Sequence, residues 1–283
     1  MDVQRRRGGW DLAVELAPHL DAWTATQPYT PHVHSGDVGW HLRSGPDAVD
    51  GTLLAWEVDG APVAAGLLDA GVLRLAFAPG WSASEGLAAQ VARECVDLEY
   101  VDALSGTALR QRLLATGWSA DPDPWVVLHK DLGAADADHD DPASRPLDGP
   151  ADVEARVAVQ RSAFAPGSTF TPSLWRHMAA GPTYDGRFEQ VAWTPDGRAA
   201  AAATGWFAGP GATAILEPVG THREHRRQGY GRRVNLAVMA ALARAGAGGI
   251  RVHTPASNEA AVLAYESCGL RRVDVTTAVT RVG

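Results

Sequence analysis

The two stretches of chain on either side of residues 133–150 carry the same order of expected elements, and this repetition constrains the fold more than any other feature. The stretch between them is rich in Asp, Ala, Gly and Pro, which is typical of a linker. Each side reads as helix, antiparallel strands, helix, strand, helix and strand. An internal duplication is the economical explanation. The sequence therefore predicts an α/β (α+β) protein with two tandem domains, residues 1–132 and 151–283, each a mixed, mostly antiparallel sheet flanked by helices.

Apolar spacing and turn residues place the individual elements. Ser84 is a plausible N-cap, and Asp59-Gly60 is typical of a hairpin turn. In the first half we expect helices at 11–26, 84–94 and 107–116 and strands at 38–42, 53–58, 63–68, 72–77 and 125–128. In the second half we expect helices at 151–164, 172–180, 229–245 and 258–268 and strands at 188–193, 199–207, 212–219, 250–254 and 272–282.

Composition limits the classes of function. The formal net charge of −8 over 283 residues argues against general nucleic-acid binding; it favours cationic small substrates, or serves solubility alone. The sequence has no apolar run long enough to cross a membrane, and the basic start leads into no apolar leader, so we expect a cytoplasmic protein without a membrane partner. The two cysteines, Cys95 and Cys268, offer no disulfide framework and no zinc spacing, and no metal is expected.

Residues 215–234 combine glycines and arginines between an expected strand and an expected helix. The strand ends near Thr221, a polar loop follows, and Gly229 and Gly231 open the helix. Backbone N–H groups at a helix start lack partners within the helix, and the helix dipole adds partial positive charge there. Glycine lets a phosphate approach the backbone closely, and arginine adds bidentate donors. The turn is therefore predicted to bind an anion.

Two familiar nucleotide-binding loops do not fit this turn. A P-loop requires Gly-Lys-Ser or Gly-Lys-Thr, whereas residues 229–233 read Gly-Tyr-Gly-Arg-Arg. A dinucleotide-binding loop requires a third glycine where Val234 stands and an acidic residue at the end of the next strand, which residues 250–254 lack. Residues 226–231, Arg-Arg-Gln-Gly-Tyr-Gly, resemble the Arg/Gln-x-x-Gly-x-Gly/Ala pyrophosphate loop of the GNAT superfamily of acyl-coenzyme A-dependent N-acyltransferases.

A second signature strengthens the resemblance. Residues 258–270 read Asn-Glu-Ala-Ala-Val-Leu-Ala-Tyr-Glu-Ser-Cys-Gly-Leu, which is similar to the family pattern Asn-x-x-Ala-x-x-x-Tyr-x-x-x-Gly-Phe/Leu. One helix and one strand separate the two signatures, as in the family. The resemblance covers about residues 151–282 and implies a GNAT-like domain there, with the first half as a tandem, degenerate GNAT-like copy.

The resemblance implies acetyl-coenzyme A as a co-substrate. In the family, the pantetheine arm enters the gap beside the strand before the loop, so backbone groups near Val219 and Thr221 would pair with it, and the Val219 N–H would stabilise the thioester oxygen. Pro218 and Gly220 predict a bend in this strand. The residues thereby assigned to coenzyme binding are Val219, Thr221, Arg226, Arg227, Gln228, Gly229, Tyr230, Gly231, Arg232, Asn258 and Ala261.

Two residues are assigned to proton transfer. Tyr265 matches the tyrosine that, in many family members, donates a proton to the departing thiolate; the alternative is a tyrosine packed on its helix face. Glu217 is the candidate base for the attacking amine because it shares a strand face with Val219 and Thr221; the alternative is an ion pair with an arginine. His222 and His225 are spaced like metal ligands, but no third ligand is in view.

The first half lacks these features. Aligned on Gly117-Trp118 and Gly269-Leu270, Leu113 takes the place of Tyr265 and Gly106 that of Asn258. Residues 80–86 contain no arginine, and Glu85 would oppose a phosphate. We therefore expect a single coenzyme site, in the second half, and a substrate cleft between the halves is one hypothesis.

The function expected from these residues is N-acetyl transfer from acetyl-coenzyme A to a primary amine of a small molecule, by direct attack in a ternary complex. The alternative is a non-catalytic acyl-coenzyme A sensor that binds a partner protein. The acceptor amine, the acyl chain preference and the oligomeric state stay open at this point, as does whether Glu217 acts directly or through water.

Overall fold

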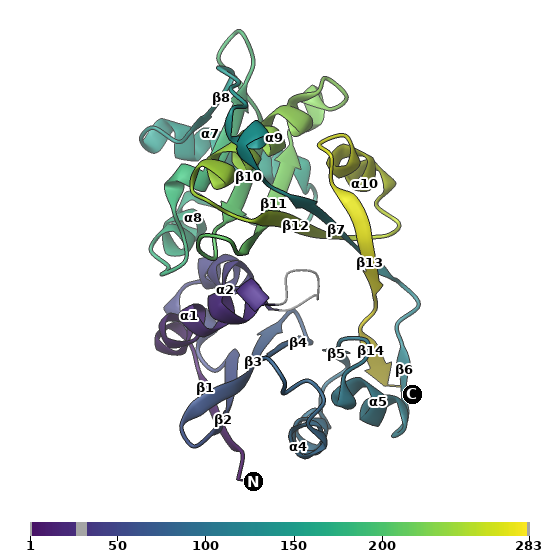
Figure 1. Cartoon of the computed structure of the whole chain (residues 1–283). Coiled ribbons are helices and arrows are strands. Elements are labelled where there is room, and N and C mark those ends of the chain that lie inside the picture. Colours follow the sequence, from purple (N-terminus) through teal and green to yellow (C-terminus); the bar gives the residue numbers. More distant parts are fainter. Residues whose placement is uncertain (1, 27–32, 282–283) are drawn as a thin grey trace.

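Two seven-stranded sheets organise the protein in the computed structural model, which describes residues 2–26 and 33–281 (Figure 1). Sheet A has the strand order β1 (Gln4–Gly8), β2 (Leu53–Val58), β3 (Ala61–Asp69), β4 (Val72–Phe77), β5 (Tyr100–Asp102), β14 (Val279–Arg281), β6 (Trp118–Ala120). Sheet B has the strand order β8 (Ser144–Pro146), β9 (Glu189–Trp193), β10 (Ala199–Trp206), β11 (Thr213–Thr221), β12 (Gly249–Pro255), β7 (Trp125–Asp131), β13 (Arg271–Thr276). Val282, the end of the last expected strand, lies outside the described residues.

The two sheets follow one plan. In each sheet, counted in the strand order given above, the first four strands are antiparallel to one another. The fourth strand pairs parallel with the fifth, and the last two pairs are antiparallel. The parallel pairs are β4 with β5 in sheet A and β11 with β12 in sheet B. The expected duplication and the mixed, mostly antiparallel sheets are thereby confirmed.

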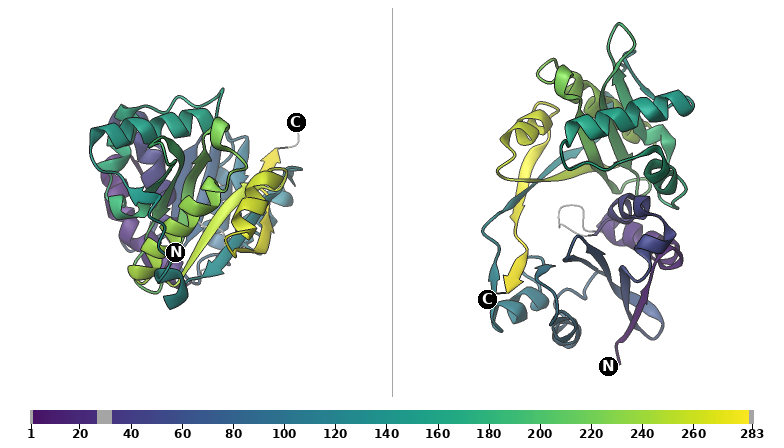
Figure 2. Two further views of the ribbon diagram at one scale, coloured as in Figure 1. Left: turned by 90° about the horizontal axis from the view of Figure 1, so that it is seen from above. Right: turned by 180° about the vertical axis from the view of Figure 1, so that it is seen from behind.

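The sheets exchange one strand each across the linker. The last strand of the first half, β7, lies in sheet B between β12 and β13, and the last strand of the chain, β14, lies in sheet A between β5 and β6. Both occupy the sixth position of the sheet that they join. The two crossovers run side by side along one edge of the molecule in both views (Figures 1 and 2). The sheets therefore do not follow a division at residue 132.

Helices flank the sheets. They are α1 (Trp10–Thr26), α2 (Ser35–His41), α3 (Pro46–Val49), α4 (Glu85–Glu94), α5 (Ala108–Leu114), α6 (Ala134–Ala137), α7 (Pro150–Ala163), α8 (Pro172–Ala179), α9 (Tyr230–Arg244) and α10 (Glu259–Glu266), with short 3-10 turns η1 (Leu42–Ser44), η2 (Gly186–Phe188) and η3 (Arg223–His225). Ser84 caps α4 as expected, because its hydroxyl accepts the Leu87 N–H at 3.3 Å. The linker carries α6 and β8.

Small residues let two helices approach sheet B from opposite faces. Ala201 and Ala203 of β10 join the core beneath α9, whereas Ala202 packs against Val159 of α7. Figures 1 and 2 show these helices from the two sides. Alternate side chains of a strand point to opposite faces, so this alanine run serves both layers.

The strand expected at residues 38–42 is wrong, because these residues lie in α2 and η1. Val38, Trp40 and Leu42 alternate as in a strand, but His34 and Asp37 form a capping box that starts a helix: the Asp37 carboxylate accepts the His34 N–H at 2.7 Å. Strand β1, which pairs with β2, was not expected either, because its residues are mostly arginine.

A buried ion pair joins α7 to sheet B. Arg156 Nε donates to Glu189 Oε1 at 2.5 Å, and both side chains are fully buried. The other carboxylate oxygen of Glu189 accepts hydrogen bonds from Trp175 Nε1 at 2.8 Å and from the Tyr184 hydroxyl at 2.6 Å. The charge is compensated and well hydrogen-bonded, as a buried carboxylate requires.

Within the described ranges, the helices are all too short or too polar to span a bilayer.

Candidate functional site

Strands β11 and β12 separate in the middle of sheet B. Their parallel pairing covers residues 213–215 of β11 opposite residues 249–251 of β12, within the described part of the chain. Both strands continue beyond these pairs, β11 to Thr221 and β12 to Pro255. On its other side β11 stays paired with β10, with a register shift between Ala203 and Gly205. The edge of β11 beyond Ile215 is therefore available to an added extended chain.

The helix after β11 begins as the sequence predicts. Gly229 adopts a left-handed conformation with φ 85°, and α9 starts at Tyr230 with no side-chain cap. A Cβ at Gly231 would lie 2.9 Å from the Thr221 hydroxyl oxygen, so only glycine lets the helix start this close to the strand. The first N–H groups of α9 thus lie beside the end of β11.

Several polar side chains of this loop brace neighbouring backbone. Arg226 Nη2 donates to the Ala163 carbonyl at 2.9 Å, and Arg232 Nε donates to the Ser267 carbonyl at 3.0 Å. Gln228 Nε2 donates to the Glu224 carbonyl at 3.0 Å. Arg227 is exposed and has a positive φ of 60°, unusual for a non-glycine residue. Arg226 and Arg232 each keep further N–H donors for a phosphate.

Gly220 has a packing reason that the sequence did not disclose. A Cβ there would lie 2.8 Å from Cβ of Ala163, at the end of α7. At the same end of α7, Ser162 Oγ accepts a hydrogen bond from the Arg223 N–H at 3.0 Å. The close approach of α7 fixes the loop and explains why glycine stands at position 220.

A cavity of about 650 Å³ opens where β11 and β12 part. The second half contributes Glu217, Val219, Asn258, Ala261 and Tyr265, which are therefore brought together as the sequence predicts. The loop residues 226–232 do not line this cavity. The first half closes it with residues that belong to no recognised motif, namely Asp37, Trp40, Arg74, Tyr100, Asp102, Asp121, Asp123 and Trp125.

Glu217 stands where the strands diverge, in an environment that favours its neutral form. Burial and the nearby carboxylate of Asp37 raise the pKa of Glu217 to about 8, and Arg74 only partly offsets this. The backbone carbonyl of Glu217 accepts the Trp206 indole N–H at 2.5 Å, which anchors this part of β11. A carboxyl group with a pKa near neutrality is suited to accept a proton from an amine.

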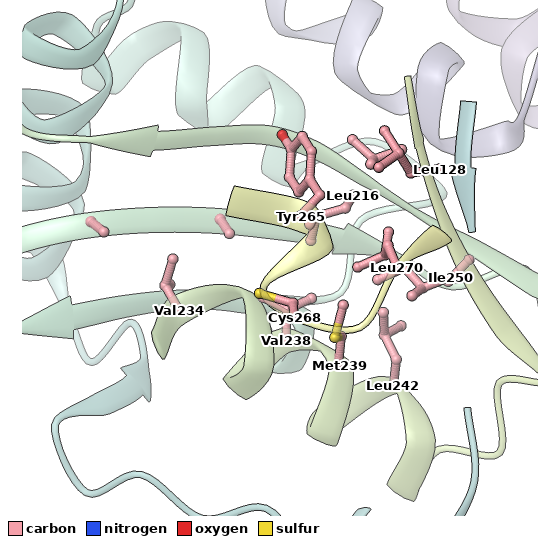
Figure 3. Packing of buried hydrophobic residues seen from close by; sticks show 14 of the residues in the cluster. Leu128, Leu216, Val234, Val238, Met239, Leu242, Ile250, Tyr265, Cys268 and Leu270 are labelled. Carbon is pink, nitrogen blue, oxygen red and sulfur yellow. The ribbon is translucent and has the colours of Figure 1, made fainter. Parts of the chain in front are cut away.

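Tyr265 projects from α10 toward the same cavity. Its side chain packs in the core of the second half and is 8% exposed. Figure 3 shows the ring beside Leu216, with the hydroxyl oxygen directed away from Cys268 and Val238. Burial and the neighbouring Glu217 raise the pKa of Tyr265, so the phenol keeps its proton at neutral pH. It is thus able to donate one.

Helix α2 carries Asp37 into the site from the first half. A Cβ on Gly36 or on Gly39 would lie 2.4 Å from atoms of Trp206, so these two glycines let α2 pack directly on β10. His34 Nε2 hydrogen-bonds to the Thr213 carbonyl of β11 at 3.1 Å. The spacing Gly36-x-x-Gly39 is the sequence signal for this close helix packing. It could be interpreted only once the structure showed that Trp206 is the residue against which the two glycines pack.

Other residues singled out from the sequence make contacts within the protein. Asn258 caps α10, because its side chain accepts the Ala261 N–H at 3.3 Å. Cys268 is buried in the core. His222 caps η3 and lies against His225 with ring centroids 5.6 Å apart. In the described ranges, His, Cys, Asp and Glu nowhere gather in groups of three or more that could hold a metal ion.

The corresponding elements of the first half differ in chemistry. Leu113 is fully buried on α5, where α10 carries Tyr265. Thr107 caps α5, with its hydroxyl accepting the Arg110 N–H at 3.2 Å. Ser84 occupies the start of α4, and Glu85 follows in its first turn. In the first half, a capping side chain and an acidic residue therefore occupy the start of α4, whereas the start of α9 in the second half has no side-chain cap.

Known proteins support the same fold and family. The family model described as "Acetyltransferase (GNAT) family" matches residues 160–270. A GCN5-related N-acetyltransferase from Sphaerobacter thermophilus is 18% identical, with a TM-score of 0.58, covering 99% of this chain and 96% of that one. A GNAT-family acetyltransferase from Colwellia psychrerythraea is 14% identical, with a TM-score of 0.62 and full coverage of both chains.

A third solved structure has the tandem arrangement in its description. It is a tandem GNAT protein from the clavulanic acid biosynthesis pathway, without AcCoA, 17% identical, with a TM-score of 0.58 over 99% of this chain and 98% of that one. The curated proteins contain no significant match to the sequence. The full-length likeness confirms two tandem GNAT-like domains.

Proposed function

We propose that this chain, whose residues 160–270 form an acetyltransferase domain of the GNAT family, moves an acetyl group from acetyl-coenzyme A to a primary amine of a small molecule. The observation that carries the proposal is Glu217: a carboxyl group with its pKa raised to about 8, in one cavity with Tyr265, where β11 leaves β12. A protonated alkyl amine must lose a proton before it attacks, and a departing thiolate must gain one. The two groups supply these functions.

The residues present fit a coenzyme. Gly231 leaves room at the start of α9 that a Cβ would fill, and the uncapped helix start presents N–H donors suited to a pyrophosphate. Gly229 supplies the left-handed turn. We assign the pyrophosphate to the backbone of residues 226–231 with Arg226, Arg227 and Arg232 near the phosphates, and the pantetheine arm to the free edge of β11 around Val219 and Thr221.

Glu217 and Tyr265 divide the proton transfers. Glu217 takes a proton from the ammonium group of the acceptor, directly or through water, and the amine nitrogen then bonds to the thioester carbonyl carbon as the carbon–sulfur bond breaks. The Tyr265 hydroxyl gives its proton to the leaving thiolate, and the Val219 N–H stabilises charge on the carbonyl oxygen. The nitrogen loses a second proton, which restores the Tyr265 hydroxyl, and Glu217 releases its proton to solvent. The products are an amide and coenzyme A, and both side chains regain their starting state.

The proposal is tested with acetyl-coenzyme A and a broad panel of small amines. Free thiol is followed during turnover, and coenzyme binding is measured by calorimetry. We expect amine-dependent thiol release that Glu217→Gln and Tyr265→Phe reduce. Tight coenzyme binding without thiol release for any amine would instead make the chain an acyl-coenzyme A sensor, and absence of binding would remove both functions.

A further inference from the structure

The cavity extends from Glu217 to the place where the chain crosses between the sheets. Asp121 and Asp123 line it there, between β6 and β7, as do Trp125 at the start of β7 and Thr276 at the end of β13. The Asp121 N–H donates to the Ala278 carbonyl at 2.9 Å, and Trp125 stands opposite Thr276 in the strand register. We call Asp121, Asp123, Trp125 and Thr276 the crossover rim.

The crossover rim has one polar group without a hydrogen-bond partner. Thr276 is 7% exposed, and its hydroxyl oxygen is buried without a partner among residues 2–26 and 33–281. Leaving a buried hydroxyl unpaired is unfavourable, so nearly all such groups in proteins are bonded. The Thr276 hydroxyl is therefore a position at which a polar group of a ligand is stabilised.

The charged groups that line the cavity indicate the sign of the charge on that ligand. Four aspartates line it, Asp37, Asp102, Asp121 and Asp123, against two guanidinium groups, Arg74 and Arg251. Glu217 is left out of this count because its raised pKa favours the neutral form, and burial also raises the pKa of Asp102.

The two arginines leave this excess in place. Arg74 lies 4.0 Å from Asp37 and 3.6 Å from Asp69, so carboxylates already surround it. Burial lowers the pKa of Arg251 to about 10, because the charged guanidinium loses its hydration, and the nearby Asp37 partly offsets this. The net charge of the lining favours a ligand with more than one positive group.

The carboxylates of the crossover rim point to a cation of a particular kind. The Asp121 carboxylate accepts the Asp123 N–H at 2.8 Å, which leaves its other oxygen for a ligand. Trp125 is 42% exposed and offers an indole face, which attracts ammonium groups. Two carboxylates, a hydroxyl and an indole together suit an ammonium group on an aliphatic chain.

We propose that the acceptor is a small aliphatic amine with two or more ammonium groups, of which one is acetylated beside Glu217 and another binds at the crossover rim. This inference rests on the proposed function and adds the class of acceptor. It also gives the first half a role in specificity, because Asp121, Asp123 and Trp125 precede the linker.

The test compares linear terminal diamines of increasing length with monoamines of the same carbon count, using thiol release from acetyl-coenzyme A. We expect the best diamine to exceed its matched monoamine in kcat/KM by about tenfold. The double variant Asp121→Asn/Asp123→Asn should reduce this ratio to within about twofold, and Thr276→Val should reduce it in the same direction. High salt should also reduce it, because exposed charges are screened.

A matched double variant, Asp59→Asn/Asp140→Asn, removes the same charge from exposed positions outside the cavity lining and should keep the ratio. Equal kcat/KM for diamines and monoamines at every length, or a ratio that the rim variants leave intact, would overturn the inference while the proposed function stands. If no amine elicits thiol release, the proposed function fails and the inference fails with it.

Discussion

Asp37, from the first half of the chain, shares a cavity with Glu217, from the second, and its carboxylate raises the pKa of Glu217. Asp37 lies on α2, and Glu217 stands at the point where β11 leaves β12. The proton affinity of the candidate base thus depends in part on a residue outside the matched GNAT domain, which begins at residue 160.

The first prediction concerns pH. If Glu217 is the base, kcat/KM for the amine should rise as pH increases through about 8, because the carboxyl group then loses the proton that blocks it. Asp37→Asn removes a neighbouring negative charge, so the midpoint should move to lower pH by about one unit. Glu217→Gln should cost roughly 100-fold in kcat. A pH profile of Asp37→Asn that coincides with that of the wild type would contradict the coupling; Asp59→Asn is the control.

The second prediction concerns Tyr265. Tyr265→Phe keeps the ring in the core and removes only the hydroxyl, so the free energy of unfolding should change little. We expect kcat to fall by roughly 100-fold with little change in the Kd of coenzyme A, because a general acid acts in the transition state. Single-turnover kinetics and calorimetry separate the two quantities. An unchanged chemical step would return Tyr265 to a packing role.

The third prediction concerns the start of α9. Gly231→Ala places a Cβ 2.9 Å from Thr221 Oγ1, which should push the helix start away from β11 and weaken coenzyme A binding by about tenfold. The double variant Thr221→Ala/Gly231→Ala removes the opposing oxygen and should recover most of the affinity, as measured by calorimetry. Gly167→Ala, where the nearest backbone oxygen is 4.0 Å from the new Cβ, is the control. Failure of the second substitution to restore binding would argue against a steric cause.

The fourth prediction concerns the buried ion pair. Glu189→Gln leaves the Arg156 guanidinium buried without its counter-charge, which should cost about 3–5 kcal/mol of unfolding free energy. Asp185→Asn breaks the exposed pair with Arg187 and should cost about 1 kcal/mol or less. Urea denaturation followed by circular dichroism measures both. Similar losses of unfolding free energy for the two variants would show that the buried pair contributes no more to stability than the exposed pair.

Local features of the sequence were sufficient to predict the duplication, the glycine loop and the position of Ser84 as a cap. These depend on residues close together in the chain: Gly229 needs only its own left-handed conformation, and Ser84 only the next turn of helix. Glu217 and Val219 share a strand face by the period of two, and the structure places them in one cavity.

The contribution of the first half to the site was not predictable in the same way. Val38, Trp40 and Leu42 satisfy the strand period as well as a helix, and the place where α2 packs depends on contact between Gly36, Gly39 and Trp206, a residue far away in sequence. An acidic residue such as Asp121 has no recognisable motif, and it joins the site only because the chain crosses between the sheets there.

That crossing has a consequence for the integrity of the protein. A fragment ending in the linker would lack β14, the sixth strand of sheet A. Its own strand β7 would have no sheet to pair with. The fragment that follows would have the reverse defect in β14. Two separate halves could complete both sheets only by exchanging these strands. The chain therefore has the architecture of a strand-exchanged dimer whose two subunits are joined in one polypeptide. Neither half should then persist folded when the other is lost.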